Sequence, residues 1–245
     1  MPEPKTVAVT GASRGIGAAI ARELARRGFT VACLTRKGTG PQDGGPADAR
    51  FVNEACDVDD EAAVKSALAA VVRRTGGLHG LVNNAGVHSA APSHTLATES
   101  YERIMATNAR AVFVACREAY PHLAASGGGL IINIGSFFDK MGVKRNLAYC
   151  ASKAAVGAIT RCLAVEWADR NIRVLDVAPG YIETDLNREA VSAGPLRDFL
   201  AKRIPAGRPG TSHEVARLVA ALYAEELPFF NGETLYLDGG QGIAH

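Results

Sequence analysis

Tyr149 and Lys153 stand four positions apart in the segment Tyr-Cys-Ala-Ser-Lys, and Ser136 precedes Tyr149 by thirteen residues. Residues i and i+4 of a helix project from the same face, so the Lys153 ammonium is expected beside the Tyr149 hydroxyl. A nearby cation stabilises phenolate, so we expect the pKa of Tyr149 to be lowered from about 10 toward neutrality. Such a phenol can donate and accept a proton. Taken alone, such a pair is more often a surface Tyr and Lys on an alanine-rich helix, so the rest of the chain must support the catalytic interpretation.

A glycine-rich turn near the amino end is a second candidate for chemistry. The β-branched run Thr6–Thr10 leads into Gly-Ala-Ser-Arg-Gly-Ile-Gly at residues 11–17 and then into a helical pattern that ends at Gly28. Glycines let the backbone approach a pyrophosphate, whose charge the N-terminus of the helix stabilises. The spacing differs from Gly-x-Gly-x-x-Gly, and in isolation such a stretch could be a simple turn. Its position between a strand and a helix predicts a dinucleotide-binding loop.

The end of the next predicted strand, Thr30–Thr35, bears on the choice of dinucleotide. A chain that prefers NAD is expected to place Asp or Glu there, to bind the adenine ribose hydroxyls. This chain has no carboxylate at Thr35 and continues with Arg36. Together with Arg14 in the glycine turn, Arg36 is predicted to bind a 2′-phosphate, although both side chains could simply be solvated.

Strands and helices alternate along the rest of the chain, which predicts a parallel sheet with helices on both faces. The further expected strands are Phe51–Cys56, Leu78–Val82, Leu130–Gly135, Ile172–Val177 and Thr234–Leu237. The expected helices cover 60–74, 98–123, 149–167 and 211–225, the last opened by a capping box at Thr211 and Glu214. The carboxyl ends of such strands share one ligand-binding edge, where Gly11, Asn83, Ser136 and Pro179 should converge.

Two stretches are predicted to depart from the regular alternation. Residues 38–49 hold four glycines and two prolines where a crossover helix is normal, so we expect that helix to be missing or reduced to a loop. Residues 181–210 carry Gly194-Pro195, Pro205 and Pro209-Gly210 and are predicted to form an irregular, mobile lid.

Length and composition predict one α/β domain spanning residues 1–245. The 27 basic and 25 acidic residues give a formal charge of +2, which argues against nucleic acid or an acidic membrane as the main partner and favours a small molecule.

There is no signal-peptide pattern and no apolar run near the ~20 residues of a membrane helix, so a cytoplasmic location is expected. The five cysteines are scattered without a Cys-x-x-Cys motif and are predicted to be reduced core thiols, with no disulfide and no metal site.

Together these motifs resemble the classical short-chain dehydrogenase/reductase family over essentially the whole chain. The matching stretches are Thr10-Gly-x3-Gly-Ile-Gly17, Asn83-Asn-Ala-Gly86, Asn108, Ser136, Tyr149-x3-Lys153, Pro179-Gly180 and Leu237-Asp-Gly-Gly240. The resemblance implies a single Rossmann-like domain with a seven-stranded parallel sheet. It also implies a homotetramer and hydride transfer between a nicotinamide cofactor and a carbonyl or alcohol carbon.

The resemblance assigns four catalytic roles. Tyr149 would donate the proton in reduction and accept it in oxidation, and Lys153 would lower its pKa and bind the nicotinamide ribose. Ser136 would hydrogen-bond the substrate oxygen, and Asn108 would hold a relay water behind the lysine. These roles suit the chemistry, because hydride arriving at a carbonyl carbon builds negative charge on oxygen, which requires donors aimed at it.

Within the family, Arg14 and Arg36 are typical of members that prefer NADP(H). Asp57 is expected at the adenine amino group, with a helix cap as its alternative. The residues expected to bind the cofactor are Gly11, Ser13, Arg14, Gly15, Ile16, Gly17, Arg36, Asp57, Val58, Asn84, Ala85, Gly86, Tyr149, Lys153, Pro179, Gly180, Ile182 and Thr184.

The segment from Val177 to Asp185 is similar to bacterial 3-oxoacyl-acyl-carrier-protein reductases, and NADPH-dependent reduction of a 3-oxoacyl thioester or related ketone is the expected activity. Those reductases carry basic residues before the fifth strand to dock the carrier protein, whereas this chain has Ser126-Gly-Gly-Gly129 and keeps only Arg170. An oxidative alcohol or hydroxysteroid dehydrogenase is the alternative. A non-catalytic nucleotide-binding module is a third hypothesis, because fold does not imply activity.

Residues near Ser136 and Tyr149 offer two suggestions about the substrate. Lys140, Lys144 and Arg145 could favour an anion or form a solvated loop. Phe137, Phe138, Leu147 and Tyr181 could line an apolar pocket.

Overall fold

The computed structural model describes residues 4–42, 48–184, 194–225 and 227–244, and one seven-stranded parallel sheet forms its centre. The strand order is β3-β2-β1-β4-β5-β6-β9. The strands are β1 (Thr6–Thr10), β2 (Thr30–Thr35), β3 (Phe51–Ala55), β4 (Gly80–Asn83), β5 (Gly129–Ile134), β6 (Ile172–Pro179) and β9 (Thr234–Leu237). The order reverses between β1 and β4, as in a doubly wound Rossmann-like sheet. The predicted fold class is therefore confirmed.

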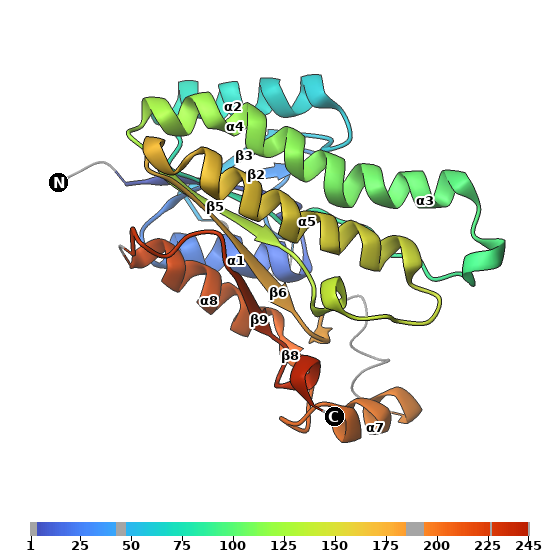
Figure 1. Cartoon of the computed structure of the whole chain (residues 1–245). Coiled ribbons are helices and arrows are strands. Elements are labelled where there is room, and N and C mark those ends of the chain that lie inside the picture. Colours follow the sequence, from blue (N-terminus) through green and yellow to red (C-terminus); the bar gives the residue numbers. More distant parts are fainter. Residues whose placement is uncertain (1–3, 43–47, 185–193, 226, 245) are drawn as a thin grey trace.

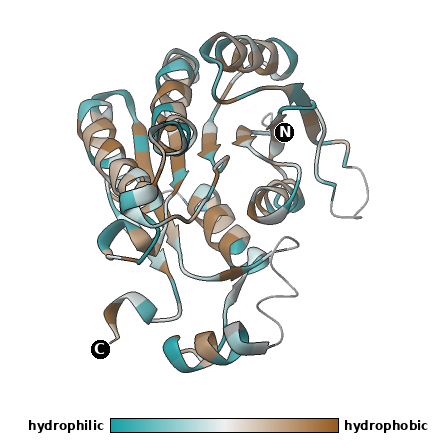
Figure 2. Cartoon of the chain, turned by 90° about the vertical axis from the view of Figure 1, so that its right-hand side faces the viewer, coloured by the Kyte–Doolittle hydropathy of each residue, from teal (hydrophilic) through white to brown (hydrophobic). Residues whose placement is uncertain are grey.

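Helices cover both faces of this sheet (Figure 1). One face carries α1 (Gly15–Arg26) and α8 (Ser212–Ala224), and the other carries α2 (Glu61–Thr75), α4 (Ala111–Ala125) and α5 (Leu147–Glu166). Because neither face of the inner strands meets water, β1 is buried along its whole length and is uniformly apolar or β-branched. Figure 2 shows hydrophobic residues concentrated on the central strands.

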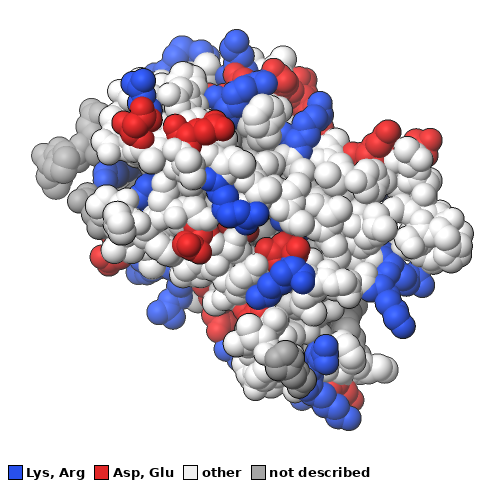
Figure 3. All heavy atoms as spheres, viewed as in Figure 1, with Lys and Arg blue, Asp and Glu red and all other residues white. Residues whose placement is uncertain are grey.

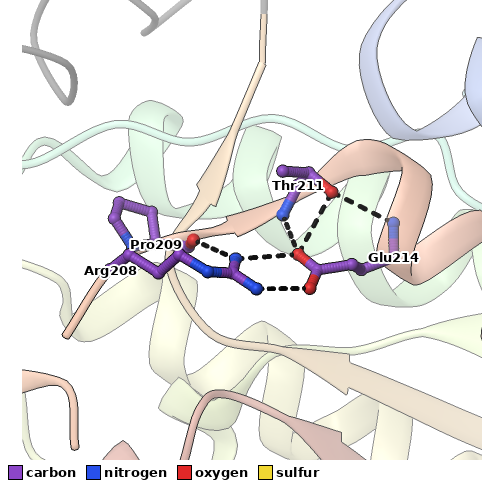
Figure 4. A network of polar contacts seen from close by, with 4 residues as sticks. All are labelled: Arg208, Pro209, Thr211 and Glu214. Carbon is purple, nitrogen blue, oxygen red and sulfur yellow. Dashed lines mark hydrogen bonds and ion pairs between the residues drawn. The ribbon is translucent and has the colours of Figure 1, made fainter. Parts of the chain in front are cut away.

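Side-chain caps fix where two of the helices begin. Asp60 Oδ1 accepts a hydrogen bond from the Ala62 N–H at 2.9 Å, at the start of α2. Thr211 Oγ1 accepts from the Glu214 N–H at 3.2 Å while Glu214 accepts from the Thr211 N–H at 2.8 Å, which confirms the predicted capping box (Figure 4). Arg208 donates to both oxygens of Glu214 and holds the pKa of that carboxyl at about 2.

The long helix predicted for residues 98–123 is interrupted. It consists of α3 (Thr98–Met105), a π-helical turn η2 (Ala106–Arg110) and α4. A π turn inserts an extra residue without interrupting the helical direction, so the apolar periodicity of the sequence does not reveal it. Asn108 lies in this turn and is fully buried.

The link between β2 and β3 contains no helix within its described parts, residues 36–42 and 48–50. Residues 43–47 of the predicted helix-free stretch lie outside the described residues. The Thr35 hydroxyl accepts from the Thr39 N–H at 2.8 Å and donates to the Thr39 carbonyl at 2.9 Å, which closes a turn after β2. The Gln42 N–H donates to the Ser13 carbonyl at 2.7 Å, so this loop packs onto the glycine turn.

The prediction that residues 181–210 are irregular holds for residues 204–209, which form turns, bends and irregular structure, and is wrong for residues 182–183, 194–203 and 210. β7 (Ile182–Glu183) pairs with β8 (Gly210–Thr211), and α7 (Gly194–Arg203) lies between them in sequence. The Gly-Pro pair that suggested a loop stands at the helix start, where the missing proline N–H costs no helical hydrogen bond. Leu200 and Ile204 are buried against Tyr181, which joins this segment to the site end of the sheet. The role of a lid stays a prediction, and residues 185–193 lie outside the described residues.

The surface and the cysteines agree only partly with expectation. Acidic and basic side chains are interspersed on the face shown in Figure 3. Cys33, Cys56 and Cys116 are buried free thiols, whereas Cys162 is exposed on the outer side of α5, so the prediction of five core thiols is wrong there.

None of the described helices combines the length and the apolarity that a bilayer crossing requires.

Candidate active site

Ser136, Tyr149 and Lys153 come together at the carboxyl end of β5. Ser136 lies two residues after the end of that strand, and α5 places the other two on one face. The Lys153 Nζ donates to the Ile134 carbonyl at 2.7 Å and lies 5.7 Å from the centre of the Tyr149 ring. A hydrogen bond with Ser136 favours the ionised form of the Tyr149 phenol. The structure thus brings the three predicted side chains into one cluster.

The pKa values in this cluster differ from expectation. Burial raises the pKa of Tyr149, and the hydrogen bond with Ser136 opposes this only in part. Burial also lowers the pKa of Lys153 to about 8, while the negative charge of Asp176 acts in the opposite direction. For Tyr149, burial outweighs the group that stabilises the phenolate, so its pKa lies above its ordinary value rather than below it. The prediction that Lys153 brings the pKa of Tyr149 toward neutrality is therefore wrong.

Asn108 uses its whole side-chain amide to hold neighbouring segments together. Its Oδ1 accepts from the Val87 N–H at 2.8 Å, and its Nδ2 donates to the Val87 carbonyl at 2.9 Å and to Ser152 Oγ at 3.1 Å. The Ser152 hydroxyl in turn donates to the Tyr149 carbonyl at 2.8 Å. Asn108 therefore ties the chain after β4 to the first turns of α5. Its role in holding a water stays a prediction.

The glycine turn and the segment after β4 form one unit. The Thr10 Oγ1 accepts from the N–H groups of Asn84 and Ala85, each at 3.0 Å. The Asn84 Nδ2 donates to the Thr10 carbonyl at 3.0 Å. At Gly17 an added Cβ would lie 2.3 Å from the Gly11 carbonyl oxygen and 2.4 Å from Asn84 Nδ2. Only glycine fits there, so a close approach of two backbones explains this part of the motif.

The start of α1 is open to an anion. Arg14 occupies the cap position in an extended conformation and makes no side-chain capping bond. The first N–H groups of a helix have no partner within it, so this end can bind a phosphate. Gly11, with φ of +66°, and Gly15, with φ of +56°, provide the turn that leads into the helix.

Most remaining candidates for cofactor binding follow the carboxyl ends of strands, at the edge that carries Ser136. Those residues are Ser13 and Ile16 after β1, Arg36 after β2, Asp57 and Val58 after β3, Ala85 and Gly86 after β4, and Pro179, Gly180, Ile182 and Thr184 at and after the end of β6. Within the described residues, the exposed side chains of Arg14 and Arg36 have no carboxylate partner. The alternative that Asp57 caps α2 is wrong, because Asp60 does so.

Sequence reasoning missed His88. Its ring contacts that of Tyr149 edge-on, with centroids 4.9 Å apart, and its Nε2 lies 2.6 Å from Asn146 Oδ1. The only available signal was its place two residues after the Asn-Asn-Ala-Gly segment.

The predicted apolar pocket is present in part. Phe138 contacts the rings of both Tyr149 and Tyr181, at centroid distances of 6.0 and 6.1 Å, and Phe137 packs beside them. Leu147 points to solvent with 49% of its surface exposed, so it does not join them. Lys144 and Arg145 are exposed, while the Lys140 Nζ lies 3.5 Å from the centre of the Tyr236 ring.

A cavity of about 640 Å³ lies at the opposite end of the sheet, at the amino ends of β1, β4, β5 and β6. Its walls include Lys5, His79 and residues 126–129. Arg170 precedes β6 at this same end. The positions suggested for docking a carrier protein therefore lie away from Tyr149 within one chain.

Comparison with known proteins finds similarity to dehydrogenases and reductases. The family model described as enoyl-(acyl carrier protein) reductase matches residues 11–241. D-Threitol dehydrogenase from Mycolicibacterium smegmatis is 36% identical over 98% of this chain and 93% of its own length. The 3-oxoacyl-[acyl-carrier-protein] reductase MabA from Mycobacterium tuberculosis is also 36% identical, over 98% of this chain and 94% of its own. A gluconate 5-dehydrogenase from Burkholderia cenocepacia, solved in complex with NADP and tartrate, has a TM-score of 0.88 at 31% identity and covers 99% of this chain and 97% of its own.

Proposed function

Because the chain belongs to the short-chain dehydrogenase/reductase family, an oxidoreductase family that acts on secondary alcohols and ketones, we propose that it reduces a ketone with NADPH. The observation that carries this is the cluster of Ser136, Tyr149 and Lys153 at the same edge of the sheet as the N-terminus of α1, which has no side-chain cap. The cofactor supplies the hydride. The side chains of the cluster donate the proton and stabilise the negative charge on the substrate oxygen.

In this proposal Tyr149 gives its proton to the substrate oxygen. Burial raises its pKa, so the phenol is protonated near neutral pH and ready to act as the acid in reduction. Ser136 is the second donor to the same oxygen, where negative charge builds in the transition state. Lys153 binds the nicotinamide ribose hydroxyls, and Asn108 fixes the start of α5 through Ser152.

The residues of the glycine turn suit a phosphorylated dinucleotide. The helix N-terminus offers unpaired N–H groups to the pyrophosphate. Arg14 and Arg36 are exposed at the same edge and bind the 2′-phosphate in this proposal. The other positions expected to bind the cofactor, from Asp57 and Val58 to Ile182 and Thr184, complete its binding surface.

A 3-oxoacyl thioester or related ketone is the proposed substrate. The aromatic side chains of Phe138 and Tyr181 beside Tyr149 suit an apolar group next to the carbonyl. The same wall fits a hydroxysteroid, so the oxidative dehydrogenase is kept as a second candidate. A free or coenzyme-bound thioester is favoured over a carrier-bound one, since the suggested docking positions lie at the far end of the sheet. The homotetramer stays a prediction.

We expect the purified protein to oxidise NADPH with a 3-oxoacyl thioester. Absorbance of the reduced cofactor should be followed across a panel of 3-oxoacyl-CoA, 3-ketosteroid, keto-sugar acid and simple ketones, and in reverse with the matching alcohols. Faster turnover of steroid or sugar alcohols would move the assignment to the second candidate. Binding of cofactor without turnover of any substrate would support the non-catalytic hypothesis instead.

Replacing Arg36 with Asp is expected to reverse the cofactor preference. The change removes a charge-assisted hydrogen bond to the 2′-phosphate and adds repulsion, so kcat/KM for NADPH should fall about 10–100-fold while that for NADH falls little or rises. Lys65→Asp makes the same charge change on the exposed side of α2 and should leave both values near those of the unmodified protein. Preference of the unmodified protein for NADH would contradict the role given to Arg14 and Arg36.

A further inference from the structure

A buried carboxylate, Asp176, stands behind the proposed catalytic pair. It lies in β6 and is fully inaccessible to solvent. Side chains alternate between the two faces of a strand, and Ile172 and Val174 of β6 belong to the core on the α5 side. Asp176 therefore points to the side of the sheet that α5 covers.

The surroundings of this carboxylate leave one oxygen unpaired. Oδ2 accepts a hydrogen bond from Thr234 Oγ1 at 3.3 Å, while Oδ1 has no partner among the described residues. At the neighbouring Gly135, an added Cβ would lie 2.5 Å from Oδ1. The chain thus has a glycine where any larger residue would displace the carboxylate.

Gly135 also places Asp176 close to Lys153. It directly follows Ile134, whose carbonyl accepts the hydrogen bond from Lys153 Nζ. The two charges attract: Asp176 raises the pKa of Lys153, and Lys153 lowers that of Asp176. A buried charge is costly without a partner, and here each partly offsets the cost of the other.

The other charged groups around Asp176 do not replace Lys153 as its partner. Asp139, in η3 (Phe137–Lys140), is negative and raises the pKa of Asp176. Tyr236 of β9 donates its hydroxyl to Asp139 at 2.9 Å. Lys140 lies over the Tyr236 ring, and Arg161 of α5 also acts on Tyr236. Lys153 is the cation whose charge acts on Asp176.

We propose that Asp176 is a positioning residue that keeps Lys153 protonated at the active site. This rests on the proposed function, in which Lys153 binds the ribose hydroxyls. A charged ammonium binds those hydroxyls more strongly than a neutral amine does. Without the buried negative charge, burial alone would determine the charge of Lys153 and would favour the neutral form.

The pH dependence follows from the two groups. Asp176 is negative only above its pKa of about 6, and Lys153 is protonated only below its pKa of about 8. Asp176→Asn removes the negative charge at every pH, so Lys153 should lose its proton at a lower pH. The variant and the unmodified protein are expected to behave alike below pH 6 and to separate above it.

The direct test is the titration of Lys153 by NMR in protein labelled with ¹³C at the lysine ε-carbon, with Lys153→Arg to assign the signal. Asp176→Asn should lower the Lys153 pKa by on the order of one unit. The alkaline limb of log kcat/KM should move to lower pH by a similar amount. Asp139→Asn neutralises a nearby acid that does not act directly on Lys153, and it should leave that limb in place.

An unchanged Lys153 pKa in Asp176→Asn would overturn the proposal, as would an equal shift in Asp139→Asn. A uniform loss of rate at all pH values would mean that Asp176 acts only through packing and would also overturn it. If no substrate is turned over by the unmodified protein, the proposed function fails, yet the NMR titration still decides whether Asp176 sets the charge of Lys153.

Discussion

Tyr149→Phe is expected to lower kcat/KM for ketone reduction by about 10²–10⁴-fold, the usual contribution of a positioned proton donor. The change removes one hydroxyl and retains the ring, which packs against His88 and Phe138. The fold and the cofactor site should therefore persist, and the loss should appear in kcat. KM for NADPH should change little, because Lys153 and the glycine turn are untouched.

The control for Tyr149→Phe is a variant that loses a tyrosine hydroxyl outside the candidate site. Tyr120→Phe provides it, because Tyr120 of α4 packs on Trp167, away from Ser136. Rates of both variants should be measured with saturating NADPH, with cofactor affinity followed by fluorescence. A Tyr149→Phe enzyme as fast as the Tyr120→Phe control would contradict the assignment of Tyr149 as proton donor.

Gly17→Ala is expected to disable cofactor binding and to destabilise the fold. The new methyl group would lie 2.3 Å from the Gly11 carbonyl oxygen and 2.9 Å from its carbon, and backbone atoms cannot move aside as a flexible side chain can. Overpacking of this kind costs about 1–3 kcal/mol of unfolding free energy. Relief of the clash must displace either the glycine turn or Asn84, so the dissociation constant for NADPH should rise at least about tenfold, the equivalent of about 1.4 kcal/mol.

Gly142→Ala is the control for this substitution. Gly142 is exposed, and an added Cβ there would meet no atom within 4 Å. Chemical denaturation and fluorescence titration with NADPH should show values close to those of the unmodified protein for Gly142→Ala and large changes for Gly17→Ala. Normal stability and affinity in Gly17→Ala would mean that the glycine turn tolerates a side chain and is not shaped as described.

The order of the elements and the candidate site were predictable because both depend on local patterns. Thr6–Thr10, Thr30–Thr35 and Thr234–Leu237 begin and end at the residues expected from their β-branched and apolar runs. The topology then follows from strand-helix alternation, since parallel strands need crossovers and share one ligand-binding edge. Ser136 and Tyr149 lie close together because both stand at that edge, although nothing in the residues around one of them indicates contact with the other.

The sequence-based predictions that the structure contradicts, and the contact that they missed, concern features set by packing and burial. The π turn around Asn108 preserves the helical direction, so periodicity could not show it. The rise in the pKa of Tyr149 comes from desolvation, and sequence spacing reveals the neighbour Lys153 but not the depth of burial. The ring of His88, in the loop after β4, contacts the ring of Tyr149, and no sequence motif indicates this contact.

The hydrogen bonds of Thr10 bear on how the site is assembled during synthesis. Its hydroxyl accepts from residues 84 and 85, and β1 pairs with β4 as well as with β2. The first β-α-β unit therefore holds the glycine turn but lacks the segment that supports it. Loop closure over more than 70 residues must come first, and contacts of such sequence separation form slowly. A nascent chain should gain affinity for the dinucleotide only after β4 has left the ribosome.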